Sequence, residues 1–304
     1  MFQRHTILIL LSAGALLTGC SIKQIAMDSI GGGLAESSTR VYARDNDPKL
    51  VRAALPFSLK LMETLLEESP ENRDLLLATS AGFTQYSYAF VEQDAFILED
   101  EDYRASEKEI QRARKLYLRA RDYGMRGLEA AHPGFGEALR ADPEGTVATA
   151  TIEDIDLLYW TAAAWGSAIG LSVDDPSSIG QLGLMEALIY RAFELDPDFD
   201  SGAIHVFLIT YEMTKSGGDP SPEERARVHF ERAVALSQGL QAGPYLSLAE
   251  AVSIPNQDRI EFEQLLNQAL TVDPDVRPEW RLVNIIMQDR AEWLLDRTDR
   301  LFLD

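Results

Sequence analysis

Four segments of this chain end in the same way, a few residues before a proline. The prolines are Pro70, Pro133, Pro197 and Pro274, and each follows a short run that contains leucine together with alanine or glutamate. Proline lacks a backbone N–H and has a fixed φ, so it stops one helix and suits the first turn of the next. The chain is therefore built from helices that stop and restart at similar signals.

Apolar residues elsewhere recur at steps of three and four positions, which is the helical period. One such row is Leu50, Ala53/Ala54, Phe57, Leu61 and Leu65; a second is Leu75, Leu76, Thr79, Phe83, Tyr86 and Phe90. No segment alternates as a strand would, so the sequence predicts an all-α fold. Further helices are expected at about 106–131, 152–172, 179–195, 202–216, 222–238, 244–251, 257–272 and 278–299.

The spacing of the helix ends indicates a repeat. Ala192 and Ala269 stand five residues before Pro197 and Pro274, as at the end of a tetratricopeptide (TPR) repeat. Two of the intervals between the prolines are close to twice the TPR period of about 34 residues. The aromatic and glycine pattern of the first TPR helix is missing. We therefore predict a TPR-like, α-solenoid-like array of antiparallel helical hairpins with irregular long helices over residues 48–304; an unrelated helical bundle is the alternative.

The N-terminus has the anatomy of a secretory signal. Arg4 precedes an apolar run, and Thr18-Gly19 then lead into Cys20, the single cysteine of the chain, as in a bacterial lipobox. We predict a signal peptide at residues 1–19 and acyl chains on Cys20, which would anchor the protein to a membrane. Residues 20–47 are interpreted as a flexible tether, with an ordered first helix as the alternative.

The net charge is −21, and 49 acidic residues face 28 lysines and arginines. Such a surface repels nucleic acid, so we expect no nucleic-acid partner. No other apolar run is long enough to span a bilayer. Membrane contact is therefore expected only through the lipid anchor.

No residue pattern indicates catalysis or a bound metal. The run Asp196–Gly202 resembles the start of a calcium-binding loop, but Ser201 stands where glycine is needed and Phe207 where a glutamate ligand is needed. The three histidines beyond the signal, His132, His205 and His229, lack zinc-like spacing. We predict no enzyme activity, no metal and no cofactor other than the acyl chains on Cys20.

Two groups of side chains are candidates for binding. Aromatic residues beside small ones can line a cavity between helices, although core packing explains them as well. The pocket candidates are Phe83, Gln85, Tyr86, Phe90, Tyr159, Trp160 and Trp165. A basic row on one helical face could bind an anion or an acidic partner, with a salt-bridged surface as the alternative. Its members are Arg112, Lys115 and Arg119.

Four longer strings make the chain resemble the TatT family, TPR-like lipoproteins associated with TRAP transporters. The strings are Asp45–Phe57, Ser80–Val91, Ala113–Gly124 and Tyr159–Gly166, and the likeness runs from Asp45 to the C-terminus.

The resemblance implies an accessory, non-enzymatic role in the periplasm. It implies docking of the substrate-binding P component of a TRAP system, with a small hydrophobic organic acid as ligand, and a homo-oligomer such as a trimer. Ser21 after the lipidated cysteine favours the outer membrane. A TPR-type lipoprotein scaffold for envelope protein assembly is the alternative function.

Overall fold

Short polar side chains begin many of the helices. The carboxylate of Asp47 accepts hydrogen bonds from the backbone N–H groups of Lys49 and Leu50, and Asn72 and Asp102 cap their helices in the same way. Ser221 and its N3 residue Glu224 form a reciprocal capping box. These caps satisfy backbone donors that a helix leaves unpaired at its start, and they account for part of the acidic residues at the turns.

The computed structural model describes residues 40–172 and 174–303, and no β-strand occurs in them. The all-α prediction is confirmed. The helices are α2 (Pro48–Glu68), α3 (Arg73–Tyr86), the π-helical η1 (Ser87–Glu92), α4 (Gln93–Glu99), α5 (Tyr103–Ala131), α6 (Phe135–Ala141), α7 (Pro143–Val147), η2 (Ile152–Asp154), α8 (Ile155–Gly170), α9 (Pro176–Ile179), α10 (Leu182–Leu195), α11 (Phe199–Glu212), α12 (Pro222–Leu236), α13 (Gly243–Leu248), the π-helical η3 (Ala249–Ser253), α14 (Arg259–Leu270), η4 (Pro278–Trp280), α15 (Arg281–Leu295) and α16 (Thr298–Leu301).

The helix stops predicted at the four prolines are confirmed. Helix α2 ends at Glu68, α5 at Ala131, α10 at Leu195 and α14 at Leu270, each shortly before its proline. A helix was predicted to start near Gly202. Helix α11 begins slightly earlier, at Phe199, but Asp200, Ser201 and Gly202 adopt positive φ, so its regular part starts after Gly202. Whether the helices form a TPR-like array of hairpins stays a prediction.

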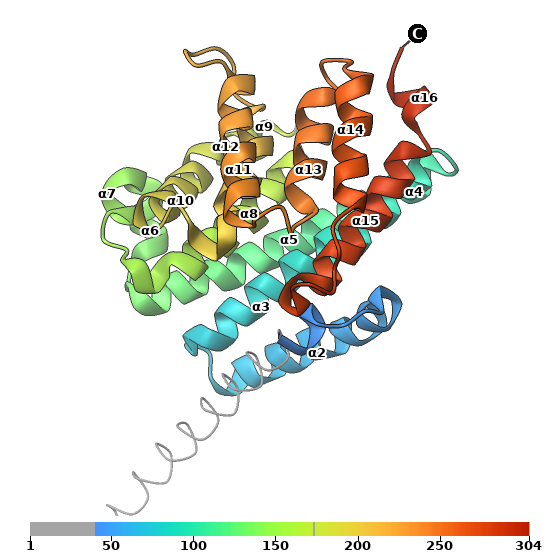
Figure 1. Cartoon of the computed structure of the whole chain (residues 1–304). Helices are drawn as coiled ribbons and strands as arrows, with labels where there is room; N and C mark the ends of the chain where they lie inside the picture. The colour runs from blue at the N-terminus through green and yellow to red at the C-terminus, as the bar shows by residue number, and fades with distance from the viewer. Residues whose placement is uncertain (1–39, 173, 304) are drawn as a thin grey trace, which may run out of the picture.

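Figure 1 shows α2 along one end of the molecule and α12, α13 and α14 at the opposite end, with α3 and the long α5 between them. Two large apolar cores hold this arrangement. The first joins α2, α3 and α5 to the C-terminal helices through residues such as Leu59, Tyr117, Phe262 and Met287. The second joins α5, α8, α10 and α11 and includes Trp165, Met185, Leu188 and Ile204.

Helices α5 and α8 approach closely because α5 has glycine where they touch. A Cβ atom at Gly124 would lie 2.1 Å from Thr161 Oγ1, and one at Gly127 would lie 2.5 Å from a methyl group of Leu157. Both glycines are buried. Any larger residue there would push the two helices apart.

Helix α2 forms as predicted, but its buried face is not the apolar row with Leu50 and Phe57. Val51, Leu55, Leu59, Met62 and Leu66 are buried instead. Both faces of the helix carry apolar residues, so the spacing could not decide which face turns inward. By contrast, every member of the second row, from Leu75 to Phe90, is buried.

Cys20, the signal peptide and most of the predicted tether lie outside the described residues. The described chain begins at Arg40, and Tyr42 already contacts the helical body, with its hydroxyl 2.5 Å from Ser58 Oγ. Within residues 40–172 and 174–303, no helix combines the length and apolarity needed to cross a bilayer.

Candidate functional site

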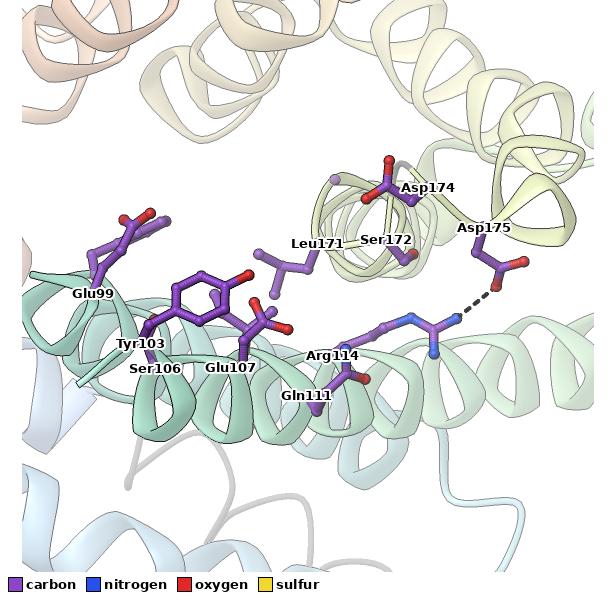
Figure 2. A pocket seen from close by; sticks show the side chains of 13 residues that line it. Glu99, Tyr103, Ser106, Glu107, Gln111, Arg114, Leu171, Ser172, Asp174 and Asp175 are labelled. Carbon is purple, nitrogen blue, oxygen red and sulfur yellow. Dashed lines mark hydrogen bonds and ion pairs between the residues drawn. The ribbon is translucent and has the colours of Figure 1, made fainter.

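A groove of about 480 Å³ lies between the start of α5 and the end of α8. Figure 2 shows Tyr103, Glu107, Gln111 and Arg114 in a row along α5, with Leu171 and Ser172 across from them. Its lining is completed by the end of α4 and the connection after α8, and comprises Phe96, Glu99, Tyr103, Ser106, Glu107, Ile110, Gln111, Arg114, Gly170, Leu171, Ser172, Asp174 and Asp175.

The charges around this groove are mainly negative. Arg114, its single cation, lies 3.3 Å from a carboxylate oxygen of Asp175 and also donates to Ser178. Hydrogen bonds from Ser177 and Ser178 hold the pKa of Asp175 below its ordinary value. Glu99, Glu107 and Asp174 add three further carboxylates to the lining. The groove therefore attracts cationic groups and hydrogen-bond donors.

Phe96 lines the groove and also contacts Arg290, which we group with Glu250 and Glu92 as the interior layer. The guanidinium carbon of Arg290 lies 4.6 Å from the ring centres of both Phe96 and Trp293, so the cation is held between two aromatic rings. The same guanidinium donates two hydrogen bonds to Glu250, at 3.1 and 2.6 Å. Cation–π contact and ion pairing together stabilise a charge that is almost fully buried.

Glu92 is the neighbouring acid, at the end of η1. The hydroxyl of the fully buried Tyr117 donates to Glu92 Oε2 at 2.5 Å. Burial raises the pKa of Glu92 to about 7; the hydrogen bond from Tyr117 and the charge of Arg290 oppose that rise, and the charge of Glu250 adds to it. This carboxyl can therefore take up or release a proton near neutral pH.

The two acids near Arg290 stand in π-helical segments. Glu92 belongs to η1 and Glu250 to η3. A π-turn inserts an extra residue into a helix and is often found at functional sites, because it redirects side chains. Tyr88 of η1 is 39% exposed and donates to Met287 Sδ of α15 at 3.9 Å. Both of these acids thus lie where the helix is distorted.

The predicted aromatic candidates divide between the two cores. Phe83, Tyr86 and Phe90 pack in the first core, whereas Trp165 packs in the second with Tyr159 against it. Rings of Tyr159 and Trp160 meet edge to face at 5.1 Å, and Trp165 donates to Gln181 at 2.9 Å. Gln85 is exposed. The structure does not bring the two aromatic groups together.

The predicted cations instead meet the first aromatic group. Arg119 lies over the ring of Phe83 at 5.4 Å, and Arg112 donates to the hydroxyl of Tyr86 at 3.3 Å. Lys115 is exposed on the same helix. Two of the three predicted basic side chains are therefore engaged with α3, and their guanidinium groups remain about half exposed.

A histidine pair is a feature that the sequence reasoning missed. His205 and His229 approach with their Nδ1 atoms 2.8 Å apart, and the ring of Phe193 stands edge-on to both. Burial lowers the pKa of His205 and lowers that of His229 to about 4. Their sequence spacing carries no signal, because the contact joins α11 to α12.

No group of three or more metal-binding side chains occurs among the described residues. The aspartates of the calcium-loop-like run serve the local structure: Asp196 accepts from the backbone N–H of Asp198, whose carboxylate pairs with Arg232 at 2.6 Å. These contacts place the run at the connection between α10 and α11.

Residues 44–302 match the family model of the TRAP transporter T-component. An uncharacterized protein of Treponema pallidum (strain Nichols) is 29% identical, and the alignment covers 95% of this chain and 95% of that protein. Both matches extend over nearly the whole helical body rather than one motif.

Proposed function

The chain belongs to the TRAP transporter T-component family, and from that premise we propose that it docks the substrate-binding P component of a TRAP system. An accessory role in such a system follows from the family. The family match over residues 44–302 is the observation that carries the proposal, because it includes every helix from α2 to α16. The helical body would act as the docking platform.

We further propose that a small organic acid passes between this protein and the P component. The interior layer offers groups suited to that task, since Arg290 is a buried cation and Glu92 titrates near neutral pH.

Acyl chains on Cys20 complete the proposal. They would hold the protein at the outer membrane, facing the periplasm, where the P component also works. Confinement beside the membrane raises the effective concentration of the partners for each other. We also propose a homo-oligomer, as the family resemblance implies; native mass spectrometry of the acylated protein reports its copy number and any ligand that copurifies.

A binding titration tests the docking step. The full chain is immobilised in detergent and titrated with the P component of the TRAP system from the same genome, with and without candidate organic acids. Saturable binding is expected, and a shift in affinity with ligand supports transfer. The proposal is wrong if no complex forms at low salt with ligand present. Capture of envelope assembly proteins, with no P component bound, would favour the scaffold function instead.

A further inference from the structure

The outer face of α2 is apolar although it lies in solvent. Leu50 is 58% exposed and Phe57 is 73% exposed, and Ala53 between them is also exposed. These residues lie one helical turn apart on the side opposite the buried row. The inner face packs α2 onto the body, and among residues 40–172 and 174–303 the outer row remains exposed to solvent.

The charges on the same stretch are all positive. From Pro48 to Met62 the charged residues are Lys49, Arg52 and Lys60, in a protein whose net charge is −21. The side chains of Arg52 and Lys60 are 48% and 69% exposed, whereas their partners Asp94 and Glu63 are 27% and 12% exposed. The cations therefore stand farther out in solvent than the carboxylates that pair with them.

Helix α5 extends this basic margin. Arg119 lies 3.7 Å from Glu63 of α2, and its side chain is 48% exposed. We call Leu50, Ala53 and Phe57, with their flanking cations Lys49, Arg52, Lys60 and Arg119, the α2 face. It combines exposed apolar side chains with positive charge, which is the composition of helices that bind at a membrane surface.

The described chain also begins beside α2. Tyr42 contacts Ser58 in the middle of α2, and the adjacent Val41 is 64% exposed. The predicted lipid site at Cys20 precedes Arg40 by about twenty residues, which can span at most about 70 Å even when fully extended. A protein anchored at Cys20 can therefore bring its α2 face to the bilayer.

We propose that the α2 face docks on a bilayer surface that contains anionic phospholipid headgroups. Leu50 and Phe57 enter the headgroup region, and the flanking lysines and arginines contact lipid phosphates. The rest of this acidic protein is repelled by such a surface, so docking orients the molecule. The opposite end, with α12–α14, then points away from the membrane (Figure 1). This inference is independent of P-component binding, because either interaction can occur without the other.

Depth-dependent fluorescence quenching tests the orientation. The full chain is placed through its anchor in phosphatidylcholine vesicles, with or without phosphatidylglycerol and with a bromolipid quencher. One variant carries a thiol-linked dye at Phe57→Cys, and the matched control carries it at Ile260→Cys on α14, which is 71% exposed. The unsubstituted chain gives the background from Cys20.

With phosphatidylglycerol present, quenching at position 57 should exceed that at position 260 by at least about threefold, and high salt should reduce the excess. Reversing two charges, with Lys49→Glu and Lys60→Glu, should abolish the excess, whereas Lys108→Glu on α5 should not. Equal quenching at both positions overturns the proposal. So does a dye at position 57 that is shielded from aqueous iodide but not quenched by lipid; that result indicates a second copy of the chain on this face.

Discussion

Replacing Glu92 with glutamine isolates the energetic effect of the carboxyl buried beside Tyr117. Glutamine keeps the acceptor for the Tyr117 hydroxyl, which lies 2.5 Å from Glu92 Oε2, and mimics the protonated acid in shape and polarity. It cannot ionise. The difference in stability between the native protein and Glu92→Gln therefore measures what ionisation at this position costs.

The pKa of Glu92 is raised from 4.5 to about 7 by burial. The folded state thus holds a proton that the unfolded state loses, so the free energy of unfolding declines as the pH rises from 4.5 through about 7. A shift of that size corresponds to a change of about 3 kcal/mol in the free energy of unfolding. We expect a change of about 2 kcal/mol, because part of Glu92 remains exposed to solvent.

Thermal unfolding of both proteins by circular dichroism checks this value. Near pH 5 the two melting temperatures should agree, whereas near pH 8.5 Glu92→Gln should melt about 5 °C higher, given about 2–4 °C per kcal/mol for a domain of this size. Glu107→Gln, at an exposed position on α5, is the matched control for removal of one carboxyl. If Glu92→Gln were destabilised equally at both pH values, the raised pKa would be refuted.

Three further predictions concern the helical body. Gly124→Ala forces a Cβ against Thr161 and should lower the free energy of unfolding in urea by about 2 kcal/mol. The control is Gly183→Ala in α10, where the added Cβ meets open space; this variant should raise the free energy of unfolding by up to about 1 kcal/mol. Asn284→Ala removes the side chain that bonds the backbone of residues 240 and 242, and should lower the urea midpoint by the equivalent of about 2–3 kcal/mol. Burial lowers the pKa of His229 from 6.5 to about 4. As the pH drops, the unfolded state therefore takes up its proton before the folded state does, and the free energy of unfolding falls between those two values. His229→Phe should remove about 2 kcal/mol of this loss, measured by thermal melts between about pH 7 and pH 4.

The helices were predictable because their signals are local. Proline stops and capping residues such as Asp47 and Ser221 act within one turn, and the predicted segments coincide with the long helices to within a few residues. Short helices such as α6 and α7 were not predicted, because they contain too few residues to show the helical spacing of apolar residues. The buried face of α2 was not predicted correctly, because both faces of the helix carry apolar residues. Only the neighbouring helices decide which face is buried.

The binding groups were harder to predict because their contacts join distant residues. Sequence spacing identified the row with Arg119 and the aromatic group with Phe83, but not that the two pack together. Glu92 has no local signal, since its pKa depends on burial and on the charges of Arg290 and Glu250. The groove of Figure 2 likewise needs the end of α8 to lie across from the start of α5.

Direct titration of the full chain with the TRAP P component, by calorimetry in detergent, tests the central claim. We expect a saturable complex whose affinity changes when a small organic acid is added. Absence of heat and of complex at low salt, with both proteins folded and with ligand present, would contradict docking as the function of this helical body.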